Sequence, residues 1–448
     1  MASTYLEKTF SGNGTNANKW TFSAWLKRTS VTTARILTAG TSTRDGLVFN
    51  SSNKLQFFVG SNSTEVNAFE TNRLFRDTNA WYHIVVSADS TQSGASNQTK
   101  LYVNGVRDTD LSQSAVDSNL TWHLGNGVRH RLGADSASLN TYFDGVMSHV
   151  HFCDGYVYDA DDFGETDANG VWKIKTSPSV TYGTNGFFIL KDGNSVTDQS
   201  GNGNNFTVAG GTLTNTEDNP SNVFATLNPL IPSNGTFSEG NNTVTTSSSS
   251  WCTVGSNLGT TSGKYYWEVK MNLLSGSTTS FYTMIGFARL QGNSSDLGSN
   301  LTSNLGDNNG VGIYSDNGSI YHPGGTVSYT SSFKTSGNII GVALDLDNNY
   351  AYWSINGTWQ NSGDPTSGAT GTGGYDLSSF ADGSFIVPAS SVQNYASANQ
   401  SENEYNFGNG YFGTTAVSSA GTNASGNGIF EYDVPTGYTA LSTKGLNT

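Results

Sequence analysis

The dipeptide Asn-Gly recurs between apolar runs, and it restricts the fold of this chain more than any other feature. Three of its copies stand out by their apolar flanks: Asn104-Gly105 in KLYVNGVRD, Asn317-Gly318 in IYSDNGSIY and Asn356-Gly357 in YAYWSINGTW. A two-residue hairpin turn needs positive φ at both central positions, and Asn and Gly tolerate this best. The flanking residues fit strands whose side chains alternate between two faces. The pattern predicts antiparallel hairpins in both halves of the chain.

The composition favours many short strands joined by turns. Of 448 residues, 53 are Gly and 12% are charged, whereas about 25% are charged in ordinary domains. Asn, Ser, Thr and Gly fill most of the space between apolar runs, and no window keeps a helical period. A chain of this length is expected to form two or three domains. We therefore predict an all-β protein in which each half forms an antiparallel sandwich or barrel; the resemblances given below favour two tandem antiparallel β-sandwiches.

Charge and hydropathy exclude several classes of protein. The net charge is −14 and no basic stripe occurs, so we expect no nucleic-acid partner. No stretch approaches the roughly 20 apolar residues of a membrane helix, and MASTYLEKTF lacks the basic and apolar segments of a secretory signal. Cys153 and Cys252 are far apart in sequence, and we interpret them as free thiols.

Strand signals divide the chain at a segment that holds three of its 8 prolines. Proline cannot donate a hydrogen bond to a sheet, so this segment is expected to be a linker or an edge. The predicted boundaries are a first sandwich over 1–212, the linker or edge over 213–235, and a second sandwich over 236–448. Each half is long enough to bury its own core.

Four blocks of the first half carry a resemblance to a known family. They are WTFSAWLKR (20–28), WYHIVVSAD (81–89), KLYVNGVRD (100–108) and YFDGVMSHVHF (142–152). In order and spacing they resemble the laminin-G/pentraxin-like domain of the concanavalin A-like superfamily, which implies a jelly-roll of two antiparallel sheets. The continuation through FGETDANGVWKIK, YGTNGFFILK and SGNGNNFTVAG is similar to a variant in virion proteins of marine bacteriophages.

The second half resembles a SPRY domain. The matching blocks are GKYYWEVKM (263–271), MIGFARL (284–290), GVGIYSDNG (310–318), IIGVALDLDNNYAYWSINGTW (339–359) and SFIVPAS (384–390). This resemblance implies a second two-sheet sandwich, of a kind that mostly binds other proteins through its loops. The closing VPTGYTALST (434–443) is also similar to the end of phage proteins with this architecture.

Aromatic residues beside turns are the candidate ligand-binding residues. They are Trp122, His123, Tyr321, His322 and Trp359, each flanked by Asn, Ser or Gly. Exposed aromatic faces stack on sugars, and nearby amides and hydroxyls fix the orientation of the sugar. The alternative for each of them is packing in a core or at an edge.

Acidic residues near the end of the first sandwich could hold a calcium ion. Asp144, Asp159, Asp161 and Asp162 lie close in sequence and offer hard oxygen ligands, and laminin-G and pentraxin relatives often bind Ca²⁺. The alternative is that they are ordinary turn acids. His149 and His151 at i, i+2 could likewise begin a metal site with Cys153, or belong to a half-buried strand.

The sequence favours binding over catalysis. Laminarinase-type enzymes of the first fold carry the spacing E-x-D-x-x-E, whereas here Glu165 and Asp167 are followed by Gly170 in place of the third acid. The leading hypothesis is therefore a non-catalytic phage virion surface protein, from tail or capsid, that binds a host-surface glycan or protein. A purely structural decoration protein is the main alternative, and a glycan-degrading enzyme is the second.

The same hypothesis sets the expected location and partners. The protein would lie on the extracellular surface of the particle, contact other virion proteins, need no cofactor apart from the calcium considered above, and form a homo-oligomer. Symmetric assembly is usual for virion parts, and a trimer is our expectation.

Overall fold

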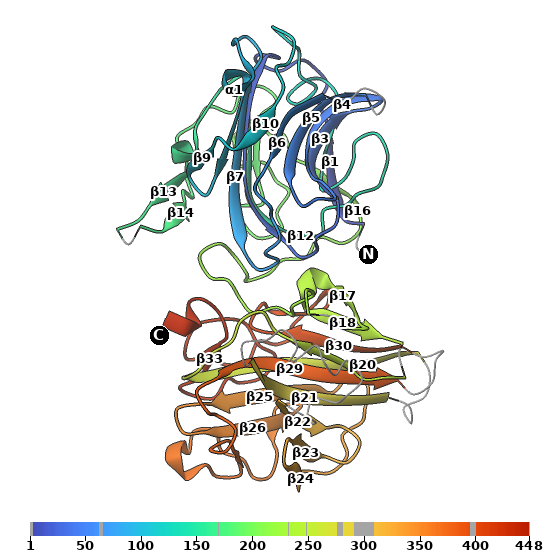
Figure 1. Ribbon diagram of the computed structural model, residues 1–448, viewed down its shortest axis with the longest axis vertical. Coiled ribbons are helices and arrows are strands. Elements are labelled where there is room, and N and C mark those ends of the chain that lie inside the picture. Colours follow the sequence, from blue (N-terminus) through green and yellow to red (C-terminus); the bar gives the residue numbers. More distant parts are fainter. Residues whose placement is uncertain are drawn as a thin grey trace. The chain divides into compact units, whose positions relative to one another are not determined.

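The computed structural model describes residues 3–61, 66–168, 170–231, 233–247, 249–275, 281–290, 309–394 and 400–447. The chain forms two compact units, unit 1 (Met1–Asn215) and unit 2 (Thr216–Thr448), each drawn in Figure 1. Nearly all of the regular secondary structure in both units is β-strand, paired antiparallel apart from β20 with β33, which confirms the predicted all-β class.

Unit 1 contains an eight-stranded and a six-stranded antiparallel sheet. The larger sheet has the order β10-β6-β5-β4-β3-β11-β1-β16, and the smaller has the order β15-β12-β2-β7-β8-β9. The larger sheet comprises β1 (Tyr5–Thr9), β3 (Ala34–Gly40), β4 (Thr43–Phe49), β5 (Leu55–Ser61), β6 (Val66–Thr71), β10 (Leu111–Gln113), β11 (Arg129–Leu132) and β16 (Thr207–Gly210). The smaller comprises β2 (Lys19–Arg28), β7 (Trp81–Asp89), β8 (Thr99–Val103), β9 (Val106–Asp108), β12 (Gly145–Asp154) and β15 (Phe187–Ile189).

The core of unit 1 lies between these sheets. Trp20 and Phe22 alternate with Thr21 on β2, and both aromatic side chains are fully buried. The Trp20 ring meets Phe57 of the opposite sheet edge-on, with ring centroids 5.2 Å apart. Burial of each such side chain stabilises the fold by about 1.5–3 kcal/mol, so the alternation of apolar residues holds the two sheets together.

The outer face of the six-stranded sheet in unit 1 is also covered. The segment after β12 contains η1 (Ala160–Asp162) and the hairpin of β13 (Gly164–Thr166) and β14 (Trp172–Ile174). It packs Phe163 and Tyr182 against Val85, Tyr102 and Cys153 of the sheet. The one short α-helix of the described residues, α1 (Ala95–Gln98), joins β7 to β8.

Unit 2 is a second pair of sheets. The larger follows the order β17-β18-β30-β20-β25-β26-β27, with β28 added beside β26 and β33 beside β20, and the smaller follows β19-β29-β21-β22-β23-β24. The larger comprises β17 (Thr236–Ser238), β18 (Thr243–Thr246), β20 (Lys264–Ser275), β25 (Ile339–Asp345), β26 (Tyr350–Ile355), β27 (Thr358–Trp359), β28 (Tyr375–Asp376), β30 (Gln400–Asn406) and β33 (Thr439–Ala440). The smaller comprises β19 (Cys252–Gly255), β21 (Phe281–Leu290), β22 (Gly310–Tyr314), β23 (Ser319–His322), β24 (Gly325–Ser328) and β29 (Phe385–Asn394). Outside these sheets lie the pair β31 (Tyr411–Phe412) and β32 (Thr415–Ala416), and the 3₁₀ turns η2 (Glu239–Asn241), η4 (Gly368–Thr370) and η5 (Gly445–Asn447).

Both faces of β26 are buried. Trp353 points into the main core, where its indole N–H donates to the Ile285 carbonyl at 2.9 Å. Tyr352 points the other way, into a cluster closed by Phe430 and Tyr438 from the end of the chain. The C-terminal segment therefore covers a face that an isolated two-sheet sandwich would leave to water.

A buried carboxylate fixes this covering segment. Glu268 of β20 is fully buried and accepts hydrogen bonds from the backbone N–H of Glu431 and Tyr432, each at 2.9 Å. The Tyr266 hydroxyl and the Asn406 amide donate to it as well, at 3.0 and 3.1 Å. Burial raises the pKa of Glu268 to about 7, although all four donors act to lower it.

The predicted hairpins are present. Asn104-Gly105 joins β8 to β9, and Asn356-Gly357 joins β26 to β27, with positive φ at all four residues. The third hairpin is looser, because β22 ends at Tyr314 and β23 begins at Ser319, and only Gly318 of its Asn-Gly pair has positive φ. A four-residue connection relaxes the need for a left-handed Asn.

The proline-bearing segment expected to be a linker or an edge is largely packed. Phe224, Ala225 and Leu227 are buried within unit 2. Leu227 forms an isolated bridge with Ser256. Pro220 and Pro229 lie outside the strands, but apolar residues between them still occupy core positions.

The helices of the described residues include none that is both long and apolar enough to span a membrane.

Candidate functional site: an aromatic face of unit 2

The five predicted ligand-binding residues do not form one site. Trp122 is 1% exposed, contacts Trp20 and Phe57 in the core of unit 1, and donates its indole N–H to the Asn18 carbonyl at 2.9 Å. Its ring cannot stack on a ligand, so the prediction of an exposed aromatic face at Trp122 is wrong. The turn that follows the residue gave no sign that its side chain points inward.

His123 is held by an acid rather than presented to a ligand. Its Nδ1 lies 3.2 Å from Asp45 Oδ1, and its backbone N–H donates to the other carboxylate oxygen. The hydrogen bond to Asp45 raises the pKa of His123. The imidazole therefore stabilises the connection between β10 and β11.

Three predicted residues lie in unit 2, at two different places on the sandwich. Tyr321 and His322 are neighbours on β23, so their side chains point to opposite faces of the strand. His322 lies 5.6 Å from the Tyr375 ring and accepts the Gly324 N–H at 3.1 Å. Trp359 is half-buried, and its ring lies 6.4 Å from that of Tyr266 in the larger sheet.

Tyr321 belongs to a larger group of rings, which we call the aromatic face. Its members are Trp251, Tyr282, Tyr314 and Tyr321, and each is half-buried. Tyr314 lies in the middle, with ring centroids 5.9, 6.0 and 5.3 Å from those of Trp251, Tyr282 and Tyr321 respectively. The group crosses the outer face of the smaller sheet of unit 2.

Strand register produces the aromatic face. Ile313 and Ile320 pair across β22 and β23 and point into the core, so their neighbours Tyr314 and Tyr321 must point outward. Gly312 pairs directly with Tyr321. Because Gly312 has no side chain, the Tyr321 ring can reach Tyr314 across the strand pair, and the two rings meet edge-on with centroids 5.3 Å apart.

The rings rest on a small apolar cluster and carry polar groups at their rim. Ile231 and Met284 are buried beneath them. The Asn317 amide donates to the Tyr321 hydroxyl at 3.2 Å. Lys334 lies 4.0 Å from the Tyr282 ring centroid and pairs with Asp316 at 2.6 Å. Fixed aromatic rings with amide and charged groups beside them are suited to bind a partly apolar, hydroxyl-rich ligand.

Sequence analysis missed three of the four rings. Trp251, Tyr282 and Tyr314 lie at or inside strands rather than in loops, and the search for ligand contacts was restricted to loop aromatics. The alternation in FYTMIGF and GVGIY could have assigned Tyr282 and Tyr314 to outward positions. Only the pairing of the strands shows that these positions are neighbours.

The four aspartates proposed for calcium do not form one group. Asp144 lies just before β12, whereas Asp159, Asp161 and Asp162 lie together at η1, after β12. Asp159 accepts the Tyr102 hydroxyl at 2.6 Å, and Asp162 accepts the backbone N–H of Asp159 at 2.9 Å. Across the described residues no group of three His, Cys, Asp or Glu side chains could hold a metal ion.

The two histidines of β12 both contact Phe188, with ring centroids 5.8 Å (His149) and 3.9 Å (His151) from the centroid of its ring. A register shift lies between Ser148 and His151, and His149 there has a φ of 47°. His151 is buried and its Nδ1 lies 2.9 Å from the Tyr182 hydroxyl. Burial lowers the pKa of both histidines, and among the described residues no third side chain completes a metal-binding group with them.

The acids that partly match a glucanase pattern lie on a hairpin. Glu165 lies in β13, and Asp167 lies in the turn that joins β13 to β14. Asp167 forms an ion pair with Lys173 at 2.6 Å. A retaining glycosidase needs two carboxyl groups about 5 Å apart across a substrate-binding cleft, and this hairpin does not provide that arrangement.

Comparison with known proteins agrees with the two sandwiches. Residues 3–161 match the family model described as the concanavalin A-like lectin/glucanases superfamily, and residues 264–378 match the SPRY domain. The chain therefore contains a concanavalin A-like domain followed by a SPRY domain. Both domain types suggest binding of carbohydrate or protein. Curated protein sequences include no match.

Three solved structures match parts of the chain. The SPRY domain of human HERC1 is 18% identical, with 40% of this chain and 96% of that chain covered and a TM-score of 0.30. A heptameric SAP-like pentraxin from Limulus polyphemus is 12% identical, with coverage of 34% and 70% and a TM-score of 0.26. Domain 4 of AbnA, a GH43 extracellular arabinanase from Geobacillus stearothermophilus in complex with arabinotriose, is 18% identical, with coverage of 33% and 66% and a TM-score of 0.25.

Proposed function

We propose that this protein is a non-catalytic surface protein of a bacteriophage particle, and that it binds carbohydrate on the host cell through the aromatic face of its SPRY domain. The observation that carries the binding role is the group of four half-buried rings centred on Tyr314. Rings held by one another and by the sheet lose little conformational entropy when a sugar stacks on them.

The chemistry around the rings favours a neutral or weakly charged sugar. The donors and acceptors at the rim are the Asn317 amide, the tyrosine hydroxyls and the paired Lys334 and Asp316. Since Lys334 and Asp316 have opposite charges, the rim offers hydrogen bonds without a net field. A pyranose ring presents an apolar face and a ring of hydroxyls, which matches this surface.

The virion location rests on the similarity of the sequence to phage virion proteins. The low content of charged residues, 12%, suits a protein that works outside a cell. Several copies on one particle would raise a weak single-site affinity by multivalency. A symmetric homo-oligomer, most simply a trimer, and contacts with other virion proteins are part of the same proposal.

A glycan-binding screen of the purified protein tests the binding role. The full chain is applied to a panel of bacterial surface polysaccharides, and hits are measured by isothermal titration with short oligosaccharides. Tyr321→Ala and Trp251→Ala should each weaken binding several fold to about tenfold, because loss of one stacking contact costs about 0.5–1.5 kcal/mol. Tyr321→Phe keeps the ring and should lose at most a few fold.

A matched control separates this face from the turn aromatics. Trp359 is also half-buried in unit 2, but it packs against the larger sheet, so Trp359→Ala should leave binding unchanged. Weaker binding in Trp359→Ala with no change in Tyr321→Ala would contradict the aromatic face. Absence of binding by the folded wild-type protein to every glycan would favour the structural decoration role.

Electron cryo-microscopy of the particle tests the location. An aromatic face directed away from the particle is expected for host binding. A face buried against a neighbouring virion protein would overturn the glycan proposal and support a role in assembly.

A further inference from the structure

The hairpin of β13 and β14 in unit 1, which we call the side hairpin, is largely exposed (Figure 1). Glu165, Thr166 and Lys173 are exposed, whereas Trp172 is half-buried. A Cβ added at Gly105, in the β8–β9 turn, would come within 2.5 Å of the Trp172 ring. The Trp172 side chain therefore joins the side hairpin to the six-stranded sheet.

Trp172 also reaches His83 in the middle of this sheet. Its indole N–H donates to His83 Nδ1 at 3.0 Å, and the two ring centroids lie 5.9 Å apart with 25° between the planes. Trp25 of β2 stacks on the same imidazole, with centroids 4.9 Å apart and 15° between the planes. The imidazole thus contacts one indole of the sheet and one of the side hairpin.

These contacts determine the protonation state of His83. An indole N–H can only donate a hydrogen bond, so His83 Nδ1 carries no proton. The proton of the neutral ring is then on Nε2, which lies 2.9 Å from Ser23 Oγ. His83 is 1% exposed, and burial lowers its pKa to about 3. A proton added at Nδ1 would replace the hydrogen bond to Trp172 by two opposed N–H groups.

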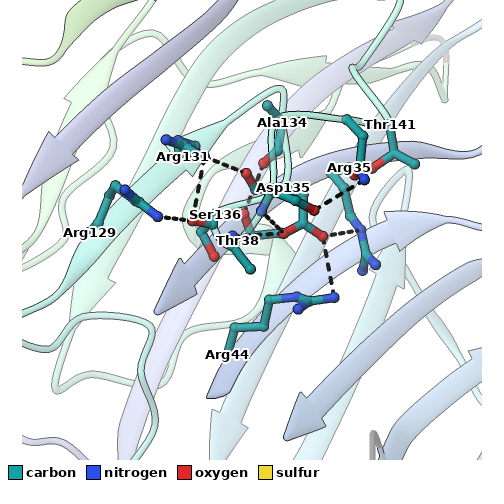
Figure 2. Close-up of polar contacts among 12 residues, drawn as sticks. Arg35, Thr38, Arg44, Arg129, Arg131, Ala134, Asp135, Ser136 and Thr141 are labelled. Atoms are coloured by element: carbon teal, nitrogen blue, oxygen red, sulfur yellow. Dashed lines mark hydrogen bonds and ion pairs between the residues drawn. The ribbon is translucent and has the colours of Figure 1, made fainter. Parts of the chain in front are cut away.

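No opposite charge stabilises a protonated His83. Asp135 shows how unit 1 pairs a buried charge, with Arg35 and Arg44 at 3.2 and 3.4 Å from its carboxylate (Figure 2). At His83 both ring nitrogens are already bonded to the uncharged groups of Ser23 and Trp172. The imidazolium would therefore have no carboxylate partner while the side hairpin is in place.

The titratable groups around His83 do not change this conclusion. On the same face of the neighbouring strands and on the side hairpin they are Lys27, Tyr102, His149, His151, Glu165, Asp167 and Lys173. His149 lowers the pKa of His83 further. Glu165 pairs with Lys173 and alternates with the positions that face the sheet, and Asp167 forms an ion pair with Lys173 at 2.6 Å. The carboxylates of the side hairpin are thus directed away from the imidazole.

We propose that the side hairpin is an acid-sensitive switch: protonation of His83 breaks the hydrogen bond from Trp172 and releases the hairpin from the sheet, while the core of unit 1 stays folded. Release admits water to His83, so the ring regains its ordinary pKa of about 6.5. The attached hairpin is therefore favoured above pH 6.5, and this contribution is lost as the pH falls toward 3. The switch belongs to the concanavalin A-like domain and does not depend on the aromatic face.

The two pKa values give the expected size of the effect. Between about pH 7.5 and about pH 4.5 the equilibrium constant for release should rise at least tenfold, and at most about 90-fold if water reaches His83 fully. Hydrogen exchange of the indole N–H groups in the full-length protein, followed by NMR at both pH values, measures this constant. Each rate is divided by that of free tryptophan at the same pH. The chain has 9 Trp, and Trp172→Phe identifies the Trp172 signal.

Trp122 provides an internal reference for unfolding of the whole of unit 1. Its indole N–H is buried in the core and donates to the Asn18 carbonyl at 2.9 Å. Release of a hairpin exposes little surface, so up to about 1 M urea should hardly change exchange at Trp172 but should accelerate it at Trp122. Equal protection and equal urea dependence of the two indoles would overturn the proposal, because the hairpin would then open only when unit 1 unfolds.

Variants assign the pH response to His83. His83→Gln offers an amide oxygen to the indole N–H but does not titrate, so protection of Trp172 should be the same at both pH values. His83→Phe keeps an aromatic ring without an acceptor, so protection should be low at both. His130→Asn changes another buried histidine and should leave the response of Trp172 as in the wild type. A wild-type response in folded His83→Gln and His83→Phe, or its loss in His130→Asn, would refute the role of His83.

Discussion

Lowering the pH from about 7.5 to about 5 should destabilise unit 1 but not unit 2. Among the groups of unit 1, His130 has the best-defined effect on the free energy of unfolding. His130 is 0% exposed. Its Nδ1 lies 2.9 Å from the Val128 carbonyl, and its Nε2 accepts the Gly125 N–H at 2.9 Å. The Val128 carbonyl can only accept a hydrogen bond, so Nδ1 carries the proton of the neutral ring. The Gly125 N–H can only donate, so protonation of Nε2 would break the hydrogen bond between Nε2 and Gly125.

The magnitude follows from the pKa. Burial lowers the pKa of His130 from 6.5 to about 4, so the unfolded chain binds a proton at a higher pH than the folded chain does. This contribution to stability is present above pH 6.5 and is lost as the pH falls toward 4. The full loss is about 3.4 kcal/mol at 1.36 kcal/mol per pKa unit, of which about 2 kcal/mol is lost by about pH 5.

Other titrating groups also contribute to the different pH dependence of stability in the two units. Burial lowers the pKa of His83 to about 3 and of His149 to about 4, and each adds a loss of the same sign in unit 1. His123 opposes them, because its pairing with Asp45 raises its pKa. In unit 2 burial raises the pKa of Glu268 to about 7, so that unit should gain stability as the pH falls from 7 toward 4.5.

Urea unfolding at each pH, read by pulsed hydrogen–deuterium exchange with mass spectrometry, measures the two units in the full chain. Peptides from unit 1 should show a lower midpoint at about pH 5 than at about pH 7.5, whereas peptides from unit 2 should not. His130→Asn should flatten the pH dependence of unit 1 by about 2 kcal/mol, and His322→Gln in unit 2 should not change it. An unchanged midpoint of unit 1 across this range would refute the assignment of neutral, buried histidines.

Three further predictions test other parts of the structure. Glu268→Ala removes the acceptor of four hydrogen bonds and should lower the free energy of unfolding of unit 2 by about 3 kcal/mol or more. In the same urea assay, Glu402→Ala on the outer side of β30 should lower it by about 1 kcal/mol or less. Equal losses in the two variants would contradict a role for Glu268 in holding the C-terminal segment. Gly105→Ala should destabilise unit 1 about 1–3 kcal/mol more than Gly94→Ala, because both glycines have a φ of 82° but only at Gly105 would a new Cβ come within 2.5 Å of Trp172; thermal unfolding of the two variants measures the difference. Excess calcium, compared with a chelator, should leave the midpoint of thermal unfolding of unit 1 unchanged. The reason is that Asp159 accepts a hydrogen bond from the Tyr102 hydroxyl, and Asp144 lies just before the start of β12. A calcium-dependent rise in the midpoint that Asp161→Asn removes would instead establish a calcium site.

Local sequence signals predicted the strands and the fold class well. Asn-Gly between alternating residues identified the β8–β9 and β26–β27 hairpins, because the φ values of a tight turn depend on the two residues within it. The blocks that resemble two known families placed both sandwiches in order. The segment before Thr236 was harder to assign, because its prolines stop strand pairing without preventing Phe224 and Leu227 from entering a core.

The candidate site was only partly predictable. Tyr321 was expected to contact a ligand and belongs to the aromatic face, but Trp122, chosen by the same rule, is in the core. Both residues lie near turns, and a turn does not determine whether the next side chain points inward or outward. Trp251 and Tyr314 are 63 positions apart in sequence. The pairing of strands in the smaller sheet nevertheless brings their ring centroids to within 5.9 Å of each other.

The sequence by itself determined where the chain turns, which residues alternate within a strand, and that two all-β domains follow one another. These properties depend on neighbouring residues and on how apolar side chains repeat. Only the tertiary structure decided that Tyr352 is as buried as Trp353, and that four rings from distant parts of the sequence meet on one face. The physical reason is that strand order and the covering of outer faces bring together residues that are far apart in the chain, and no local pattern encodes those partners.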